Sequence, residues 1–284
     1  MKKLTCICLL LVILLTACSS KKAENIDYSR LPLTDYAPFA YSQEQINDSF
    51  WQILNDTEQA RYMAYKIWLT LGLNGNLTGD FEAIENAPMD KLIDQAIFCT
   101  AAIDRTYYSD VQENYVKDNI VSRVFAEASK DGMELGEIFY ASDIEQTLIS
   151  LYGDYPLEGE SYTDHFRDGD LLEYRADVGL FLQHFDWGGS RMQPQILDVN
   201  ESANTIICDF VLVYHGYRDG HDYYEVQYEV ELDPVNFIEE TADSDVLRFT
   251  FLKAPDDGRP LLHRVETLGK FAELLHNYDL PLFY

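Results

Sequence analysis

The sequence predicts an α+β fold, in which a helical N-terminal half is followed by an antiparallel β-meander. In residues 42–153 apolar side chains recur every three or four positions, which is typical of helices that bury one face. From about residue 171 apolar and polar side chains alternate, which is typical of strands. A run of helices followed by a run of strands favours the α+β arrangement.

The first 17 residues have the order of a secretory signal peptide. A basic start, an apolar run over residues 4–15 and two small residues, Thr16 and Ala17, follow one another. The apolar run is short for a helix that spans a bilayer. We therefore expect residues 1–17 to be removed.

The segment Leu15-Thr16-Ala17-Cys18 resembles the lipobox of bacterial lipoproteins. The resemblance implies that Cys18 carries two fatty acyl chains, such as palmitate, becomes the new N-terminus and holds the protein to the extracytoplasmic face of the cell membrane. Two acyl chains give stable anchoring, whereas one binds weakly. An ordinary cleaved signal or an uncleaved anchor is the alternative. The whole chain also resembles uncharacterised lipoproteins of Gram-positive bacteria.

Residues 18–41 are expected to form a lipidated tether. They mix polar residues with two prolines and show no sustained apolar period. A tether of this kind would hold the folded body clear of the lipid headgroups.

Residues 42–153 are expected to contain the helices, one of them over 111–129. Pairs of residues that commonly open a helix mark the other starts. These pairs are Ser42 with Gln45, Asn55 with Glu58, Asn86 with Pro88, and Ser142 with Glu145. Gly153 suits the position after the last of these helices ends.

Residues 154–284 are expected to form the antiparallel strands, with a short closing helix at 268–277. Three hairpin turns are predicted, at Asn200 to Asn204, at Arg218-Asp219-Gly220 and at Asp256-Asp257-Gly258. The second turn would pair residues 206–214 with 224–232, because all the facing side chains are then apolar.

The third turn sets a register of its own. It would pair Phe249 with Val265 and Phe251 with His263, and it would place Arg248 opposite Glu266 as an ion pair. The order of a helix and then long hairpins over residues 143–267 resembles the cone-shaped NTF2-like fold. That resemblance concerns architecture and implies no activity.

The formal charge of −28 bounds the kind of partner. It argues against nucleic-acid binding, which needs clustered Lys and Arg, and against a body that lies flat on an anionic membrane. It favours solubility, cations or a basic partner. Only Cys99 and Cys208 remain in the folded part. They form either a disulfide, as an exported pair can, or two buried thiols.

The segment from Asn74 to Glu85 resembles an EF-hand calcium loop. Oxygen-bearing side chains occupy the first, third, fifth, ninth and twelfth places, and a glycine occupies the sixth. These oxygens belong to Asn74, Asn76, Thr78, Glu82 and Glu85. The first place departs from the family, which has Asp there, and Pro88 interrupts any directly exiting helix. The alternative is a helix-to-helix turn rich in Asn and Gly. Apart from calcium, no cofactor is expected.

An acidic stretch over residues 154–170 offers a different chemistry. Six carboxylates occur there: Asp154, Glu158, Glu160, Asp164, Asp168 and Asp170. Two of them could act as a glycosidase-like acid and base in an exported hydrolase, but the alternative is a solvated loop. The six histidines show no spacing typical of a metal site.

Tyrosines gather around the second predicted turn. Tyr217 and Tyr223, which flank Arg218, should project away from the main core face or sit at its rim. Exposed Tyr with Arg is typical of surfaces that recognise proteins and sugars, although the rings could instead pack against the helical half. We therefore expect a membrane-anchored module that binds an envelope protein, peptide or glycan, with the hydrolase and a calcium-stabilised scaffold as alternatives.

Overall fold

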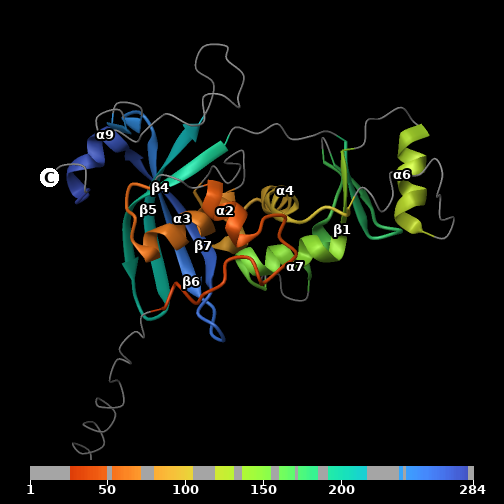
Figure 1. The fold of residues 1–284 in the computed structure, drawn as a ribbon, viewed down its shortest axis with the longest axis horizontal. Coiled ribbons are helices and arrows are strands. Elements are labelled where there is room, and N and C mark those ends of the chain that lie inside the picture. The colour runs from red at the N-terminus through yellow and green to blue at the C-terminus, as the bar shows by residue number, and fades with distance from the viewer. Residues whose placement is uncertain are drawn as a thin grey trace, which may run out of the picture.

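The computed structural model shows an α+β fold built from helices and two antiparallel sheets (Figure 1). It describes residues 26–49, 53–71, 80–104, 119–130, 136–154, 160–169, 172–184, 191–215, 237–238 and 241–280. Helices precede the main sheet along the chain, as the change in apolar period predicts.

The helical half contains α2 (Gln43–Ser49), α3 (Glu58–Leu71), α4 (Met89–Cys99), α6 (Ile120–Lys130) and α7 (Ala141–Tyr152). A short 3-10 helix, η1 (Ile84–Asn86), precedes α4. The predicted capping box at the start of α2 is confirmed. Gln45 N donates to Ser42 Oγ at 3.2 Å, and Ser42 N donates to Gln45 Oε1 at 2.8 Å.

Two other predicted helix starts are wrong. Thr57 rather than Asn55 caps α3, because its hydroxyl accepts from Ala60 N at 3.2 Å. The helix α7 begins at Ala141, one residue before the predicted capping Ser142, and no side chain caps it. In both places the start differs from the prediction by only one or two residues, which is the range over which helix ends commonly vary.

The main sheet is a meander of four strands in the order β4-β5-β6-β7. The strands are β4 (Arg191–Glu201), β5 (Thr205–His215), β6 (Asp245–Lys253) and β7 (Pro260–Lys270). The predicted turns at 200–204 and 256–258 connect β4 to β5 and β6 to β7, and both are confirmed. The closing helix is also present, as α9 (Phe271–Leu274) followed by η4 (Leu275–Asn277).

The predicted register of β6 and β7 is confirmed in part. Phe249 faces Val265 as predicted, but Phe251 faces Leu262, because an irregularity after Thr250 leaves His263 without an opposite residue. Arg248 faces Glu266, yet its ion pair is formed with Asp209 on β5 at 2.7 Å. The predicted Arg248–Glu266 ion pair is therefore wrong.

The register predicted for the hairpin around residue 219 is contradicted over residues 206–210. These residues of β5 pair with β4 on one edge and with β6 on the other, so no edge is left for residues 228–232. The face was chosen correctly, because Ile206, Cys208 and Phe210 are all fully buried. The predicted partner strand itself lies outside the described residues.

A second, smaller sheet joins the two halves of the chain. It has the order β1-β3-β2, with β1 (Glu137–Tyr140), β2 (Leu172–Arg175) and β3 (Leu180–Gln183). β1 lies within residues 42–153, which were expected to be helical, because a four-residue strand leaves no visible period in the sequence. The 3-10 helix η3 (Tyr162–His165) lies between α7 and β2 along the chain.

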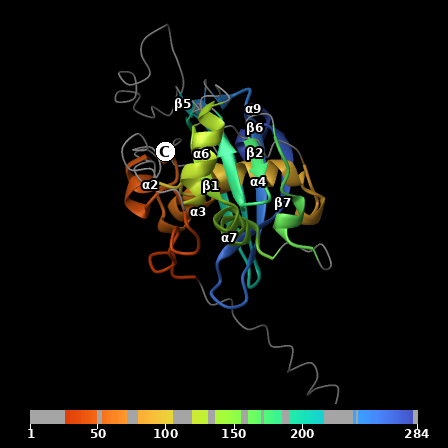
Figure 2. The ribbon, with the colours of Figure 1, turned by 90° about the vertical axis from the view of Figure 1, so that its right-hand side faces the viewer.

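The helices α4 and α7 lie between the two sheets, with the main sheet and α9 on one side and β1 and α6 on the other (Figures 1 and 2). One continuous core includes residues from α3, α4, α7 and the inner face of the main sheet. On that sheet, Phe210 and Phe249 pack edge to face with ring centroids 4.9 Å apart. The helical and strand halves thus share a core.

Residues 26–41 are packed against this body, so the prediction of a tether up to residue 41 is wrong. Tyr28 and Leu33 are 8% and 3% exposed and belong to the core. Phe39 forms a β-bridge with Thr100 just after α4. We call residues 26–41 the strap.

Cys99 and Cys208 are buried free thiols. Cys99 Sγ lies 3.0 Å from Leu69 O and accepts from Gln95 Nε2 at 3.2 Å. Burial raises the pKa of Cys99 to about 12, so the thiol stays protonated. The two cysteines act as small core residues, and the disulfide alternative is excluded in this structure.

Gly153 ends α7 in a conformation that favours glycine, as predicted. Its φ is +86° and its ψ −174°, a region populated almost only by glycine. An added Cβ would also lie 3.2 Å from Leu261 Cδ1. We expect Gly153→Ala to lower the free energy of unfolding by about 2 kcal/mol, measured by urea denaturation.

Gly169→Ala is the matched control for this prediction. Gly169 has no positive φ, and a Cβ there would meet its nearest neighbour, Leu172 Cβ, at 3.7 Å. The control should change stability by less than about 1 kcal/mol. Equal losses in the two variants would contradict the assignment of strain to Gly153.

Candidate functional site

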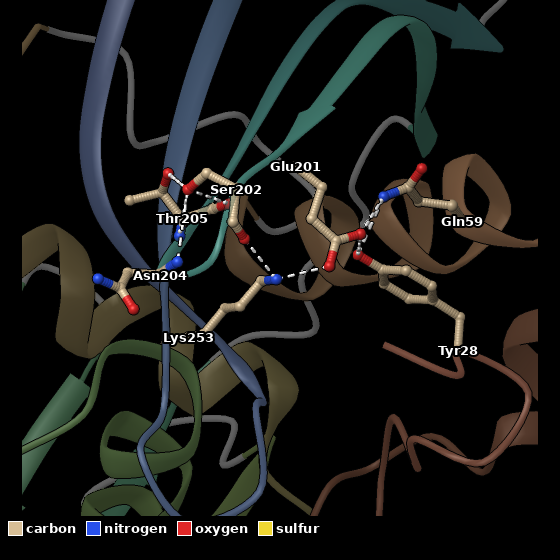
Figure 3. Close-up of polar contacts among 7 residues, drawn as sticks. All are labelled: Tyr28, Gln59, Glu201, Ser202, Asn204, Thr205 and Lys253. Atoms are coloured by element: carbon tan, nitrogen blue, oxygen red, sulfur yellow. Dashed lines mark hydrogen bonds and ion pairs between the residues drawn. The ribbon is translucent and has the colours of Figure 1, made fainter. Parts of the chain in front are cut away.

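The strap is fixed to the body by a polar network at the end of the sheet where β4 turns into β5 (Figure 3). Glu201 is its centre. One carboxylate oxygen accepts from Lys253 Nζ at 2.5 Å. The other accepts from Gln59 Nε2 at 2.7 Å and from Tyr28 Oη at 3.1 Å. The network therefore joins the strap, α3, β4 and β6.

The strands bring the two charges of this network together. Glu201 ends β4 and Lys253 ends β6, on either side of the first residues of β5. Lys253 Nζ also donates to Ser202 O at 2.7 Å, and the Ser202 hydroxyl accepts from Thr205 N at 3.0 Å inside the turn. The turn thus presents a carbonyl and a carboxylate to the same ammonium group.

Burial makes this ion pair more than a surface contact. The side chains of Lys253 and Glu201 are only 8% and 15% exposed. A pair this far from water is weakly screened, and removal of one partner leaves the other charge uncompensated. Burial and the Glu201 carboxylate raise the pKa of Tyr28 well above its usual range. Tyr28 is therefore a permanent hydrogen-bond donor to Glu201.

The strap also contacts the turn between β6 and β7. The Arg259 guanidinium lies over the Tyr36 ring, 4.3 Å from its centroid, which is a cation–π contact. Ile26 packs on Gly258, since a Cβ at Gly258 would lie 3.7 Å from Ile26 Cδ1. Both hairpin turns at this end of the sheet therefore contact the strap. We call this end of the main sheet the turn end.

Most of the site residues predicted from sequence lie outside the described residues. Cys18 is one of them, and so are Tyr217, Arg218 and Tyr223. The described part of β5 ends at His215, directly before the tyrosine-rich stretch. These assignments remain predictions.

The proposed calcium loop is described only in its second half, because Asn74, Asn76 and Thr78 lie outside the described residues. Glu82 is exposed, and Glu85 lies in η1. Two of the segment's residues are used by the sheet. Asp80 accepts from Thr267 N at 2.7 Å, and Phe81 forms a β-bridge with Val265. Calcium binding remains a prediction.

Three of the described carboxylates of the acidic stretch, Glu160, Asp164 and Asp168, take part in local structure. Asp164 closes a capping box with Ser161 at the start of η3, and this backbone hydrogen bonding lowers its pKa. Asp168 accepts from Tyr174 N at 2.8 Å. Glu160 lies 3.1 Å from His165. These contacts of Glu160, Asp164 and Asp168 therefore give no support to the hydrolase alternative.

We found no family model, no curated protein and no solved structure that matches the chain. Within the described ranges, no helix has the length and apolar character needed to cross a bilayer. In the same part of the chain, no group of three or more His, Cys, Asp or Glu side chains is placed to hold a metal ion. The site must therefore be interpreted from its own chemistry.

Proposed function

We propose that this protein is a lipid-anchored extracytoplasmic binding module that presents its recognition surface away from the membrane. The observation that carries the proposal is the strap, which fixes Ile26 and Tyr28 against the turn end of the sheet. If Cys18 carries the lipid, the position of the strap sets which end of the body lies near the membrane.

The chain between the lipid and the strap is short. Ile26 is eight positions after Cys18, and a fully extended chain over eight residue steps spans at most about 28 Å. The turn end must therefore stay within roughly that distance of the anchor. A tether that continued to residue 41 would have allowed any orientation.

The tyrosine-rich stretch begins at the opposite end of the strand. β5 has 11 residues and runs from Thr205 at the turn end to His215, a length of about 35 Å. Tyr217 comes two positions after His215 in the sequence, and Tyr223 comes eight positions after it. A recognition surface that starts from this end of β5 would suit an envelope protein, peptide or glycan, because exposed Tyr and Arg contribute much of the affinity at such surfaces.

The charge of the body is consistent with the same arrangement. The net charge of −28 becomes more negative without Lys2 and Lys3, so anionic lipid headgroups repel the body and a short lipid link holds it near the surface without laying it flat. It also favours partners that carry positive charge.

Site-specific photocrosslinking in living cells tests this proposal. A photoreactive amino acid at Asn204, in the exposed turn, should crosslink to lipid. The same amino acid at Tyr217 should crosslink to protein or glycan and give no lipid adduct. Asp90, exposed on α4, serves as the control position. Lipid adducts at Tyr217 rather than at Asn204, or crosslinks of Tyr217 no stronger than those of Asp90, would contradict the proposal.

A further inference from the structure

Among the described residues, Lys253 and Lys66 both have buried side chains, but their ammonium groups have different partners. Lys253 is paired with Glu201 at 2.5 Å and with Ser202 O at 2.7 Å, which accounts fully for its burial. Lys66, on α3, is only 3% exposed. Within the described ranges its ammonium forms no ion pair, and its hydrogen bond is to Ser150 O on α7 at 3.3 Å.

Two residues that interact with Lys66 carry donors without acceptors: Ser150, whose carbonyl Lys66 contacts, and Arg259, whose charge acts on Lys66. Ser150 is 1% exposed, and its hydroxyl has no hydrogen-bond partner. Arg259 Nε is buried without a hydrogen-bond partner, and its nearest carboxylate oxygen, on Asp257, is 3.8 Å away. Buried polar groups are nearly always satisfied, so an unsatisfied set on three elements indicates that an acceptor is missing.

The electrostatics show which kind of acceptor would fit. Burial, and after it the positive charge of Arg259, lower the pKa of Lys66 to about 7, while Cys99 and Asp257 act in the opposite direction. These are the charged or titratable groups that face Lys66 from α4 and from the turn between β6 and β7. Lys66 and Arg259 therefore repel each other when both are charged, and one carboxylate, that of Asp257, lies nearby.

We propose that Lys66, Ser150 and Arg259 bind a small carboxylate ligand between α3, α7 and the turn that joins β6 to β7. The ammonium and the guanidinium would each donate to the carboxylate, and the Ser150 hydroxyl would supply a further donor. The bound anion would compensate the charge of Lys66 in the way that Glu201 compensates Lys253.

The local charge favours a singly charged ligand. Protonated Lys66 and Arg259 contribute two positive charges and Asp257 contributes one negative charge, which leaves an excess of one. A carboxylate balances that excess, whereas a phosphate dianion would exceed it. The side chains of Arg259 and of the neighbouring Asp257 are 16% and 32% exposed, so solvent reaches the site beside the Tyr36 ring.

Calorimetric titration with sodium acetate, against a background of sodium chloride at equal ionic strength, tests the site. Near pH 8 free Lys66 is largely neutral, so binding of a carboxylate should draw a proton from the buffer. Titrations in two buffers with different ionisation enthalpies measure that proton. We expect close to one proton taken up for each acetate bound.

Three variants of the full chain make the result specific. Lys66→Met should abolish both acetate binding and proton uptake, and Arg259→Gln should weaken the affinity at least about tenfold. Lys270→Met is the control, because Lys270 is a half-exposed lysine paired with Asp245, and it should bind as the wild type does. Absence of acetate binding, binding without proton uptake, or binding that survives in Lys66→Met would overturn the proposal. None of these results depends on a membrane anchor.

Discussion

Replacing Lys66 with methionine is expected to make the protein more stable at pH 7 in buffer that lacks small carboxylates. Methionine fills a similar volume without a charge that must be desolvated. The cost that it removes follows from the pKa of Lys66, which falls from 10.5 to about 7 on folding. That difference corresponds to roughly 4–5 kcal/mol, an upper limit, since Ser150 O loses its donor. We expect a gain of at least about 1 kcal/mol in the free energy of unfolding.

The gain should depend on pH with a definite sign. Between about pH 7 and 10.5 the unfolded chain holds the Lys66 proton and the folded protein does not, so the wild type becomes more stable as the pH rises. Above that window the amine is neutral in both states and the penalty is gone. Below it both states are protonated and the penalty is constant. The advantage of Lys66→Met should therefore shrink as the pH rises from 7 to 10.

Urea denaturation of both proteins across this pH range measures the difference, because the other titrating groups cancel in the comparison. Lys253→Met is the matched control, since it removes a buried lysine that has a carboxylate partner. It should destabilise the protein. A Lys66→Met variant that is less stable than the wild type, or whose advantage is the same at every pH, would contradict an uncompensated amine at this position.

Replacing Glu201 with alanine is expected to cost about 3 kcal/mol in the free energy of unfolding. The change leaves Lys253 buried with only the Ser202 carbonyl as a partner, and it removes the acceptor for Tyr28 and Gln59. The strap should loosen at the same time. Hydrogen exchange of the backbone amides over residues 26–36 should therefore rise more than that of α7.

A double variant separates the charge from the rest of the network. Glu201→Ala combined with Lys253→Met removes both charges, so it should recover part of the lost stability. Glu266→Ala is the control, because its pair with Arg264 is partly exposed on both sides, and it should change stability by less than about 1 kcal/mol. If the double variant is as unstable as the sum of the single ones, the buried pair is not coupled.

Short-range patterns account for the part of the fold that sequence could predict. The apolar stripes of α3, α4 and α7 and the turns around residues 202 and 257 are local signals, and the structure confirms them. The bulge after Thr250 and the pairing of β5 with both β4 and β6 are not local. Both depend on how distant strands meet, which a two-residue period leaves open.

The strap also shows the limit of local sequence patterns. Its sequence looks like a flexible linker, yet Tyr28 and Leu33 supply the apolar and polar contacts that fix it. Only the concentration of aromatic residues at 28, 36, 39 and 41 could have signalled packing. The turn end, which orients the body in the proposed function, was therefore missed.

Lys66 was missed for a different reason. It lies among apolar residues of α3, between Tyr65 and Ile67 on a helix buried along most of its length. A lysine in a helix is read as part of the solvated face, and its burial depends on the positions of α7 and of the turn between β6 and β7. The signal for the burial of Lys66 would have been that α3 is apolar almost all round.

The most direct test of the account is metabolic labelling with palmitate, followed by fractionation of the cells. We expect the wild type to be labelled and found with membranes, and Cys18→Ala to be unlabelled and to lose the lipid-dependent association. Cys6→Ala and Cys8→Ala change only the part expected to be removed, so they should behave as the wild type does. A wild-type protein without label, or a Cys18→Ala protein that carries label, would show that the body is not held by a lipid at residue 18.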